Sequence, residues 1–336
     1  MISGRAPRFD IHIHLAGVGT NGSGCWTSAA FRRRPTFLAL RLLYGIRRKQ
    51  LRESIDQEWA EMVSRRVAES DIDYGVALGF DGVYDGNGHL DESRSQMIVP
   101  PGWVFEACRR HSNLLPAPSI NPYRRDALDL LEDAIEKGAV LIKWLPIVQG
   151  FDPANVRALP FLQRVAEADI PMLIHAGCGE VTFSTVDSRC GSVESLLPAL
   201  EMGIKVICAH TAAPSFFGRS QIPRLRVLLQ RFNNLWVDNS GLANPSRARH
   251  LPGFVADPLI HSRTLHGSDY PVISSAWHYR RRLDRPTLAR IRSERNGIQR
   301  DATIKAVMGY DDASFTRAAG VLANLDRWCG GENVAG

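Results

Sequence analysis

The sequence of 336 residues predicts an α/β fold of the (β/α)8 or TIM barrel type, because strand-like and helix-like segments alternate along the chain. Most strand-like segments are continuous apolar runs, which suit parallel strands covered on both faces. Residues that can bind metals stand at the carboxyl ends of several runs. The expected strands are residues 9–15, 72–79, 113–120, 139–145, 170–175, 204–210, 235–239 and 263–269.

The expected helices show apolar residues that recur every three or four positions. Residues 125–137 place Leu128, Leu131 and Ile135 on one face, and Gly138 follows as a C-cap signal. The other expected helices are residues 52–70, 154–169, 193–202 and 222–232.

The length of the chain fits one barrel with additions, since such a barrel takes about 250 residues. We expect a single domain over residues 1–336, with a helical insertion at about 24–70 and C-terminal helices at about 284–330. The first expected strand begins near residue 7, which leaves no room for a signal peptide, and no apolar stretch reaches transmembrane length. The six cysteines lack disulfide-type or metal-type spacing, so we expect reduced thiols in a cytoplasmic protein.

The net charge of +6 is concentrated in two basic segments. In residues 31–52 the basic side chains are interleaved with leucines and aromatic residues. We interpret this segment as a helical insertion that packs on the barrel mouth or on a second subunit, where barrels commonly carry lids. Residues 279–295 we interpret as a solvated helical face. We therefore expect a small-molecule substrate, with no nucleic acid or membrane partner, and leave a homo-oligomer open.

The first strand contains the most informative motif, His12 and His14. Side chains alternate between the faces of a strand, so the two imidazoles point the same way. Neutral imidazole is a common ligand of zinc and similar metals. Such a pair is a weak signal alone, but further ligand-type residues stand at or near the ends of later strands: Lys143, His175, His210 and Asp269. Because active sites of barrels lie at this end, we expect these side chains to converge.

This succession of residues resembles the amidohydrolase superfamily of metal-dependent hydrolases. The resemblance runs from about Arg8 to Leu325 and is closest to the amidohydrolase-related branch, which includes hydrolases, non-oxidative decarboxylases and hydratases. The strings that carry it are Phe-Asp-Ile-His-Ile-His, Ile-Lys-Trp-Leu-Pro, Leu-Ile-His-Ala-Gly, Cys-Ala-His-Thr and Gly-Ser-Asp-Tyr-Pro-Val.

The resemblance implies a zinc-class divalent ion. His12 and His14 supply two nitrogen ligands, and the family pattern adds His175 and Asp269. A hydrolytic metal site leaves one position open for water, whose pKa then falls toward 7. Asp269 is also expected to take the proton of that water and pass it to the leaving group.

Two further residues of the pattern determine the number of ions. His210 is expected either to bind a second metal or to act as an electrophile beside the substrate oxygen. Lys143 is expected to be catalytic, either as a carboxylated bridge between two metals or as a residue that orients substrate. Carboxylation requires a neutral amine, which burial would favour. We expect one firmly held ion, and a second if Lys143 is carboxylated.

The residues leave two enzyme classes open. The first is a hydrolase that uses metal-activated water to cleave an amide, ester or lactone-type bond. The alternative is a non-oxidative decarboxylase or hydratase that acts on a carboxylated small molecule with the same metal site. A non-catalytic barrel is the third and least favoured class. Without a metal, the many ligand-type side chains expected in the barrel would be buried and unpaired, which costs free energy. For the alternative, Arg189 and Arg280 are the candidate carboxylate-binding residues.

Substrate contacts are expected from the loops that follow the strands. The loop at residues 177–189 includes Glu180, Thr182, Phe183 and Ser184. Three aromatic residues beside the expected ligands are further candidates for the pocket lining: Trp144, Tyr270 and Trp277. For Trp144, a place between the barrel and the outer helices is an equal alternative. His266 has the opposite strand parity to Asp269, so we interpret it as structural.

Overall fold

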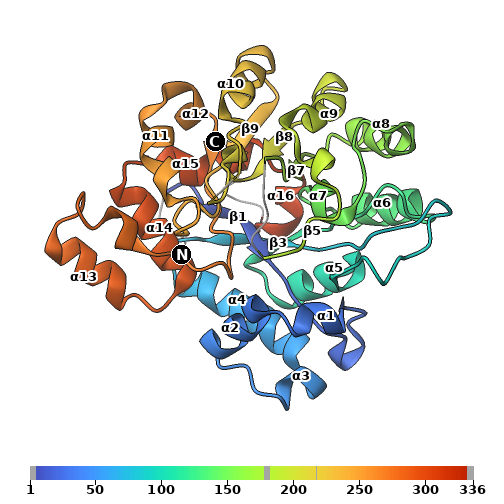
Figure 1. Cartoon of the computed structure of the whole chain (residues 1–336), viewed down its shortest axis with the longest axis horizontal. Coiled ribbons are helices and arrows are strands. Elements are labelled where there is room, and N and C mark those ends of the chain that lie inside the picture. Colours follow the sequence, from blue (N-terminus) through green and yellow to red (C-terminus); the bar gives the residue numbers. More distant parts are fainter. Residues whose placement is uncertain (1–4, 178–181, 217, 331–336) are drawn as a thin grey trace.

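The protein is a barrel of parallel strands inside a ring of helices, seen end-on in Figure 1. The structure is a computed structural model that describes residues 5–177, 182–216 and 218–330. The barrel strands are β1 (Phe9–His14), β3 (Tyr74–Leu78), β5 (Leu114–Ala117), β6 (Ile142–Trp144), β7 (Met172–Ile174), β8 (Val206–Cys208), β9 (Leu235–Asp238) and β10 (Thr264–Leu265). Each lies within an expected strand, so this part of the prediction is confirmed.

The strands follow one another around the barrel in chain order. They form two parallel sheets, β1-β3-β5 and β6-β7-β8-β9-β10. Isolated parallel bridges join the sheets at both edges, one between Ser119 and Lys143 and the other between Ile13 and Tyr270. Backbone hydrogen bonds from Ile11 to His266 and from His14 to Tyr270 strengthen the second junction. The predicted TIM barrel is therefore confirmed.

The helices cover the outside of the barrel (Figure 1). Within the insertion after β1 they are α1 (Ala29–Arg32), α2 (Pro35–Leu43), α3 (Gln50–Glu53) and α4 (Ile55–Ala68). Around the barrel follow α5 (Pro101–Arg110), α6 (Ala127–Glu136), α7 (Pro146–Gln149), α8 (Leu159–Glu167), α9 (Leu197–Glu201), α10 (Ile222–Arg231), α11 (Leu251–Ala256) and α12 (Pro258–Ser262). The chain ends with α13 (Arg285–Ser293), α14 (Gly297–Val307), α15 (Asp312–Thr316) and α16 (Leu325–Trp328).

One element of the insertion region was not expected from the sequence. A short antiparallel pair, β2 (Trp26–Thr27) and β4 (Met97–Ile98), ties the start of the insertion to the segment after β3. Two-residue strands are too short to show an alternating pattern, so no periodicity marks them.

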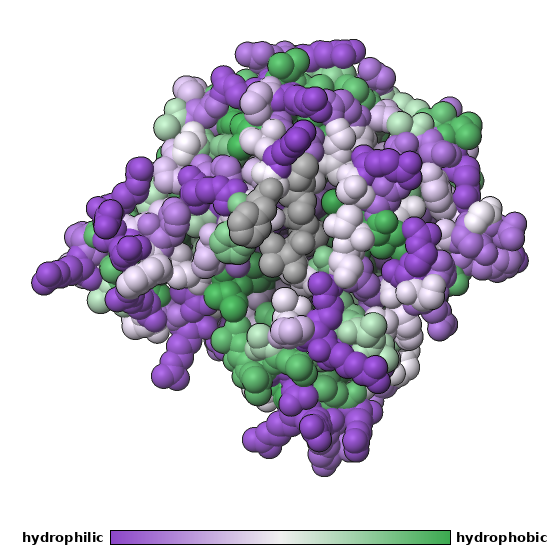
Figure 2. Space-filling view, in the orientation of Figure 1, coloured by the Kyte–Doolittle hydropathy of each residue, from purple (hydrophilic) through white to green (hydrophobic). Residues whose placement is uncertain are grey.

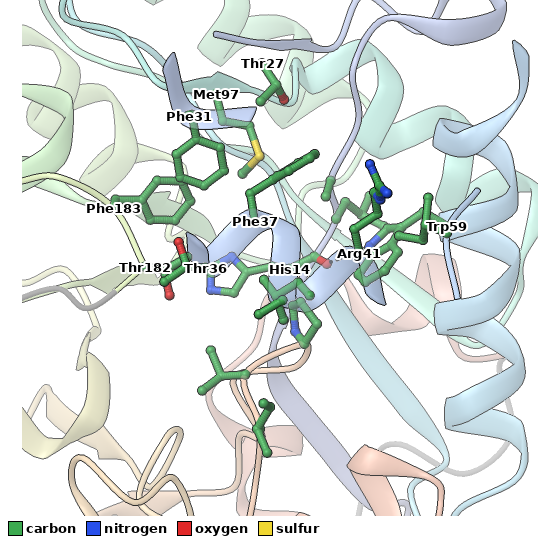
Figure 3. A pocket seen from close by; sticks show the side chains of 18 of the residues that line it. His14, Thr27, Phe31, Thr36, Phe37, Arg41, Trp59, Met97, Thr182 and Phe183 are labelled. Carbon is green, nitrogen blue, oxygen red and sulfur yellow. Dashed lines mark hydrogen bonds between the residues drawn. The ribbon is translucent and has the colours of Figure 1, made fainter. Parts of the chain in front are cut away.

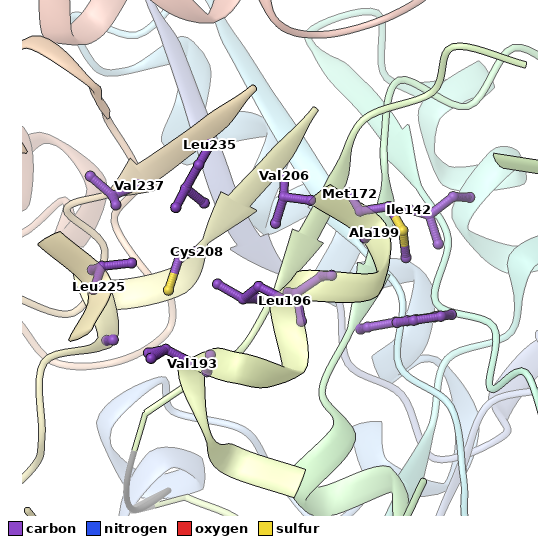
Figure 4. Packing of buried hydrophobic residues seen from close by; sticks show 14 of the residues in the cluster. Ile142, Met172, Val193, Leu196, Ala199, Val206, Cys208, Leu225, Leu235 and Val237 are labelled. Atoms are coloured by element: carbon purple, nitrogen blue, oxygen red, sulfur yellow. The ribbon is translucent and has the colours of Figure 1, made fainter. Parts of the chain in front are cut away.

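The largest apolar core lies between the strands and the outer helices. Figure 4 shows Ile142, Met172, Val206 and Leu235, from four successive strands, facing Leu196 of the segment that precedes α9. All five side chains are buried. Removal of such apolar surface from water is the dominant favourable contribution to folding.

Trp144 belongs to this outer layer. Its ring is fully buried against Phe151 and Phe161, with centroids 4.9 and 5.4 Å away. Its indole Nε1 donates a hydrogen bond to the carbonyl of Ile120 at 2.8 Å. Trp144 therefore fills the space between the barrel and the helices, the second of the two places expected for it, and does not line the pocket, because its side chain points away from the barrel interior.

The C-terminal helices close the barrel beside β10. Lys305 of α14 is fully buried, forms an ion pair with Asp301 and donates to the carbonyl of Gly267 at 2.5 Å. His266 packs against Phe315 of α15, with ring centroids 4.4 Å apart. The structural interpretation of His266 is confirmed. Within the described part of the chain, no helix has the length and apolar character needed to cross a membrane.

We predict that Trp144→Ala lowers the free energy of unfolding by about 3–5 kcal/mol, the usual cost of truncating a large buried aromatic side chain. Chemical denaturation followed by circular dichroism measures the effect, with exposed Trp277→Ala as the control. A loss below about 1 kcal/mol would contradict the position of Trp144 in the core.

Candidate metal centre and substrate pocket

The centre of the site is the carboxylate of Asp269, which lies beside both histidines of β1. Its Oδ1 is 3.2 Å from Nε2 of His14 and 3.5 Å from Nε2 of His12. The backbone N–H of Asp269 donates to the carbonyl of His12 at 2.9 Å. Asp269 adopts a φ of 64°, a left-handed conformation that is uncommon for residues with a side chain and often marks functional sites.

Lys143 approaches the same imidazole from β6. Its Nζ lies 3.4 Å from Nε2 of His12, and the side chain is buried. The alternating pattern of β6 explains this position, because Ile142 and Trp144 face the outer helices and Lys143 must face the interior. The structure therefore brings Lys143 and His12 together, as the sequence predicts.

His175 and His210 complete a cluster of imidazoles, in which His210 stacks on His12 and His175 meets His210 edge-on. The ring of His210 lies 5.1 Å from that of His12 and 5.2 Å from that of His175. His210 has a φ of 54°, and its backbone N–H donates to Oδ1 of Asp238 at 2.6 Å. The residues expected from the strand ends thus share one buried region, although they enter it from five different strands or the turns that follow them.

Asp238 is a residue of this site that the sequence analysis missed. Its Oδ2 accepts a hydrogen bond from Nδ1 of His12 at 2.7 Å. Ser240 donates its backbone N–H to Oδ1 of Asp238, and its hydroxyl also lies 2.7 Å from Nδ1 of His210. Because Asp238 holds the proton on Nδ1, Nε2 of His12 presents its lone pair to the barrel interior, as metal-binding histidines require.

Burial and local charge keep the imidazoles of His12, His175 and His210 neutral. Burial, reinforced by Lys143, lowers the pKa of His12 to about 4. Burial and the nearby Arg247 also lower the pKa values of His175 and His210 well below the usual range. The neutral form prevails at pH 7, and it is the form that coordinates metals.

The two carboxyl groups are ionised in the same environment. Burial by itself would raise the pKa of Asp238, but attraction to His12 and hydrogen bonds from its neighbours outweigh it and lower the value to about 2. Burial likewise opposes ionisation of Asp269, and the hydrogen bond with His14 and the nearby His12 lower its pKa below the ordinary value. Asp269 therefore offers a charged oxygen ligand.

The residues present fit a divalent ion. Ligand atoms of His12, His14 and Asp269 all lie within 4.8 Å of one another. Two imidazole nitrogens and a carboxylate oxygen form a donor set typical of zinc and related ions. A second cluster, of His12, His210 and Asp238, satisfies the same distance limit, but there Nδ1 of His12 is already bonded to Asp238.

A cavity of about 330 Å³ extends from His14 and Asp269 to the insertion helices. Its wall is mostly apolar, as Figure 3 shows for Phe31, Phe37 and Phe183 around the imidazole of His14. Phe31 and Phe183 stack with centroids 5.1 Å apart. The barrel therefore supplies a polar base, and the insertion supplies an apolar wall.

The loop predictions for this pocket are partly confirmed. Thr182 and Phe183 line the cavity, whereas Glu180 lies outside the described residues. Tyr270 and Trp277 were wrongly expected there. Tyr270 is buried and stacks on Trp59, because the chain turns after Asp269 and directs the ring toward α4. Trp277 is 58% exposed and lies outside the cavity wall.

The arginine candidates require a correction. Arg189 is largely exposed and paired with Asp187, and Arg280 packs over Trp277, so neither lines the cavity. Arg247 does line it, although its position nine residues after β9 gave no signal in the sequence. Arg247 is 4% exposed, and its Nε donates to the carbonyl of Ala213 at 3.1 Å. A buried cation therefore faces the same cavity as the candidate metal ligands.

Comparisons with known proteins agree with this architecture. An uncharacterized TIM-barrel protein from Bordetella bronchiseptica superposes with a TM-score of 0.57 at 14% identity, covering 90% of this chain and 99% of that one. A protein described as a probable 2-pyrone-4,6-dicarboxylic acid hydrolase from Acinetobacter baumannii gives 0.55 at 13% identity, covering 92% and 99%. No curated protein matches the chain.

At these identities the structural similarity establishes the fold. The family follows from the sequence itself, because the family model described as Amidohydrolase matches residues 9–305, which include every candidate ligand from His12 to Asp269. The chain belongs to the amidohydrolase family.

Proposed function

We propose that this protein is a metal-dependent hydrolase that cleaves an amide, ester or lactone-type bond in a small molecule. The observation that carries the proposal is the carboxylate of Asp269, which lies between the imidazoles of His12 and His14 at the base of the cavity. A hydrolase needs a base at such a position, close to the metal ligands and open to substrate.

The candidate ligands are His12, His14, His175 and Asp269. A zinc-class ion held there would supply Lewis acidity and lower the pKa of a bound water. The ionised carboxylate of Asp269 takes the proton of the attacking water and passes it to the leaving group. His210 is neutral and buried beside His12, and its Nδ1 donates to the carbonyl of Ser240 at 3.0 Å, so its Nε2 lone pair is available to bind a second ion. Lys143 orients substrate, or in a carboxylated form holds a second ion.

The second candidate function is decarboxylation or hydration of a carboxylated substrate. The specific observation in its favour is Arg247, a buried guanidinium that lines the cavity together with His14 and Asp269. Guanidinium groups bind carboxylates through paired hydrogen bonds. Hydrolysis of a carboxylated ester or lactone would use the same contact, so Arg247 favours an acidic substrate under either function.

Turnover in water labelled with ¹⁸O distinguishes these functions. The protein, purified with zinc or another divalent ion, is screened against carboxylated and neutral esters, lactones and amides, and against aromatic carboxylic acids. Hydrolysis places one ¹⁸O atom in the acid product. Release of carbon dioxide without label in the organic product, or addition of labelled hydroxyl without bond cleavage, would replace the hydrolase proposal with the lyase alternative.

We predict that the protein carries at least one zinc-class ion per chain, and that the double variant His12→Ala, His14→Ala loses it together with activity. Two of the candidate nitrogen ligands disappear in this variant, so the remaining donors hold the ion weakly. Elemental analysis of the purified proteins measures the ratio. A stoichiometric metal in the double variant would show that the ion binds elsewhere. A ratio of two in the wild-type protein would indicate the form with carboxylated Lys143.

We predict that Asp269→Asn reduces kcat by at least about 10²-fold while the fold persists, since general acid–base catalysis contributes about 10²–10⁴-fold. Asparagine has nearly the same shape but cannot accept the proton at neutral pH. The measurement is kcat on a substrate found in the screen, with metal content determined in parallel. A loss below about tenfold at full metal occupancy would leave Asp269 only a structural ligand.

We predict that Asp238→Ala weakens metal binding by about 10- to 100-fold, because Nδ1 of His12 loses the carboxylate that fixes its proton. Competition with a chromogenic chelator measures the affinity. Asp81→Ala is the matched control, since Asp81 is also a buried aspartate at the end of a barrel strand but bonds to Arg124 and Tyr84. Equal affinity in Asp238→Ala and wild type would remove Asp238 from the metal centre.

A further inference from the structure

The net positive charge of the chain resides in one segment of the insertion. Residues 29–53, which form α1, α2 and α3, contain eight basic residues and one acidic residue. The rest of the chain contains 33 basic and 34 acidic residues, so it is almost neutral. Only Lys49 forms an ion pair with the acidic residue of the segment, Glu53. Residues 29–53 thus carry a strong positive charge, and the other basic run, residues 279–295, is less one-sided, with seven basic and two acidic residues.

The same segment exposes leucines. On α2, Leu38, Leu42 and Leu43 are 42%, 75% and 54% exposed, and Leu42 is the most exposed large apolar side chain among the described residues. Leu38 and Leu42 are four positions apart and therefore lie on one face of the helix. Figure 2 shows apolar surface over α2 with hydrophilic side chains below it, at the foot of the view.

The opposite face of α2 lines the substrate cavity. Thr36, Phe37, Leu40 and Arg41 belong to the cavity wall, and Figure 3 shows Phe37 and Arg41 reaching toward it. At helical spacing, Leu38 and Leu42 lie on the other side of α2 from these residues. Helix α2 therefore lies between the cavity and the outer surface of the molecule.

We propose that residues 29–53 bind the surface of an anionic lipid membrane. Exposed leucines enter the boundary between headgroups and acyl chains, while flanking arginines and lysines attract anionic lipid headgroups. The leucines distinguish this partner from a nucleic acid, whose phosphates attract the cations but offer nothing to three exposed apolar side chains. The charge argues against a second copy of the chain, because two such segments would repel each other.

Membrane binding goes beyond the proposed function. It explains why α2 lines the cavity on one face and exposes leucines on the other. Docking through α2 would hold the apolar part of the cavity against the lipid, so that an acidic substrate with an apolar portion could pass from the bilayer surface to the base of the site. The sequence alone favoured a lid or subunit contact for this segment. The outward leucines are the observation that the structure adds.

Binding to extruded vesicles tests the proposal without reference to activity. The wild-type chain is sedimented with phosphatidylglycerol vesicles and with phosphatidylcholine vesicles at low and high salt. The variant Arg47→Gln, Arg48→Gln, Lys49→Gln removes three exposed cations, and Leu42→Ser, Leu43→Ser removes the apolar contact. The matched control is Arg109→Gln, Arg110→Gln, Lys137→Gln. These three exposed cations lie at the ends of α5 and α6, just before the next strand begins, and hence at the opposite end of the barrel.

We expect wild type and the control variant to bind phosphatidylglycerol vesicles and not to bind phosphatidylcholine vesicles. The three-cation variant should bind on the order of a hundredfold more weakly, since each basic residue near the surface contributes about a factor of five. The leucine variant should lose at least about tenfold. Circular dichroism checks that each variant is folded.

Three results would overturn the proposal. One is the absence of vesicle binding by the wild-type chain at low salt. Another is an equal loss in the control variant, which would show attraction by total charge. The third is a wild-type dimer that the leucine variant converts to monomer while vesicle binding stays unchanged, which would assign the leucines to a subunit interface.

Discussion

The carboxylate of Asp238 is the constraint on which the candidate metal centre depends. Asp238 lies at the end of β9. Its carboxylate accepts a hydrogen bond from Nδ1 of His12, which lies on β1, and another from the backbone N–H of His210, which follows β8. Three strands are thus held in fixed relation by one ionised group in a place where water cannot compete. An unpaired carboxylate there would be costly, so the arrangement persists only while all of its partners are present.

This constraint explains why left-handed backbone occurs at the site. His210 and Asp269 both adopt positive φ values, which residues with a Cβ atom rarely do. In each case contacts with neighbouring residues fix the backbone conformation. Hydrogen bonds to Asp238 and Ser240 hold His210. Asp269 is held by the hydrogen bond to the backbone of His12 and by the contact with His14. The rigid barrel supplies the free energy that holds these turns, as is common where side chains must be aimed at a reacting group.

The strands and the site residues at their ends could be predicted from the sequence, because they follow a periodic pattern. The positions of side chains that loops carry could not be predicted. Continuous apolar runs located the strands, and strand ends located His14, Lys143 and Asp269. Asp238 also ends an apolar run, so the rule that selected Asp269 could have selected it. Arg247 could not be found this way, since a loop of irregular conformation carries it into the cavity. The prediction that Tyr270 lines the pocket was wrong for a related reason. The turn after Asp269 reverses the direction of the Tyr270 side chain, and no local sequence pattern indicates that turn.

Chemistry and specificity come from different parts of this chain. The barrel supplies imidazoles, carboxylates and Lys143, and most of these residues lie in the sequence strings that carry the family resemblance. The insertion supplies Phe31, Phe37 and most of the apolar wall, and its composition follows no periodic rule of the barrel. A change in the insertion can therefore alter the substrate without moving a ligand, because α1 to α3 touch the cavity from outside the strand ends. Arg247 lies outside the insertion and its Nε is held by the carbonyl of Ala213, so this buried charge stays in the cavity wall when the insertion changes.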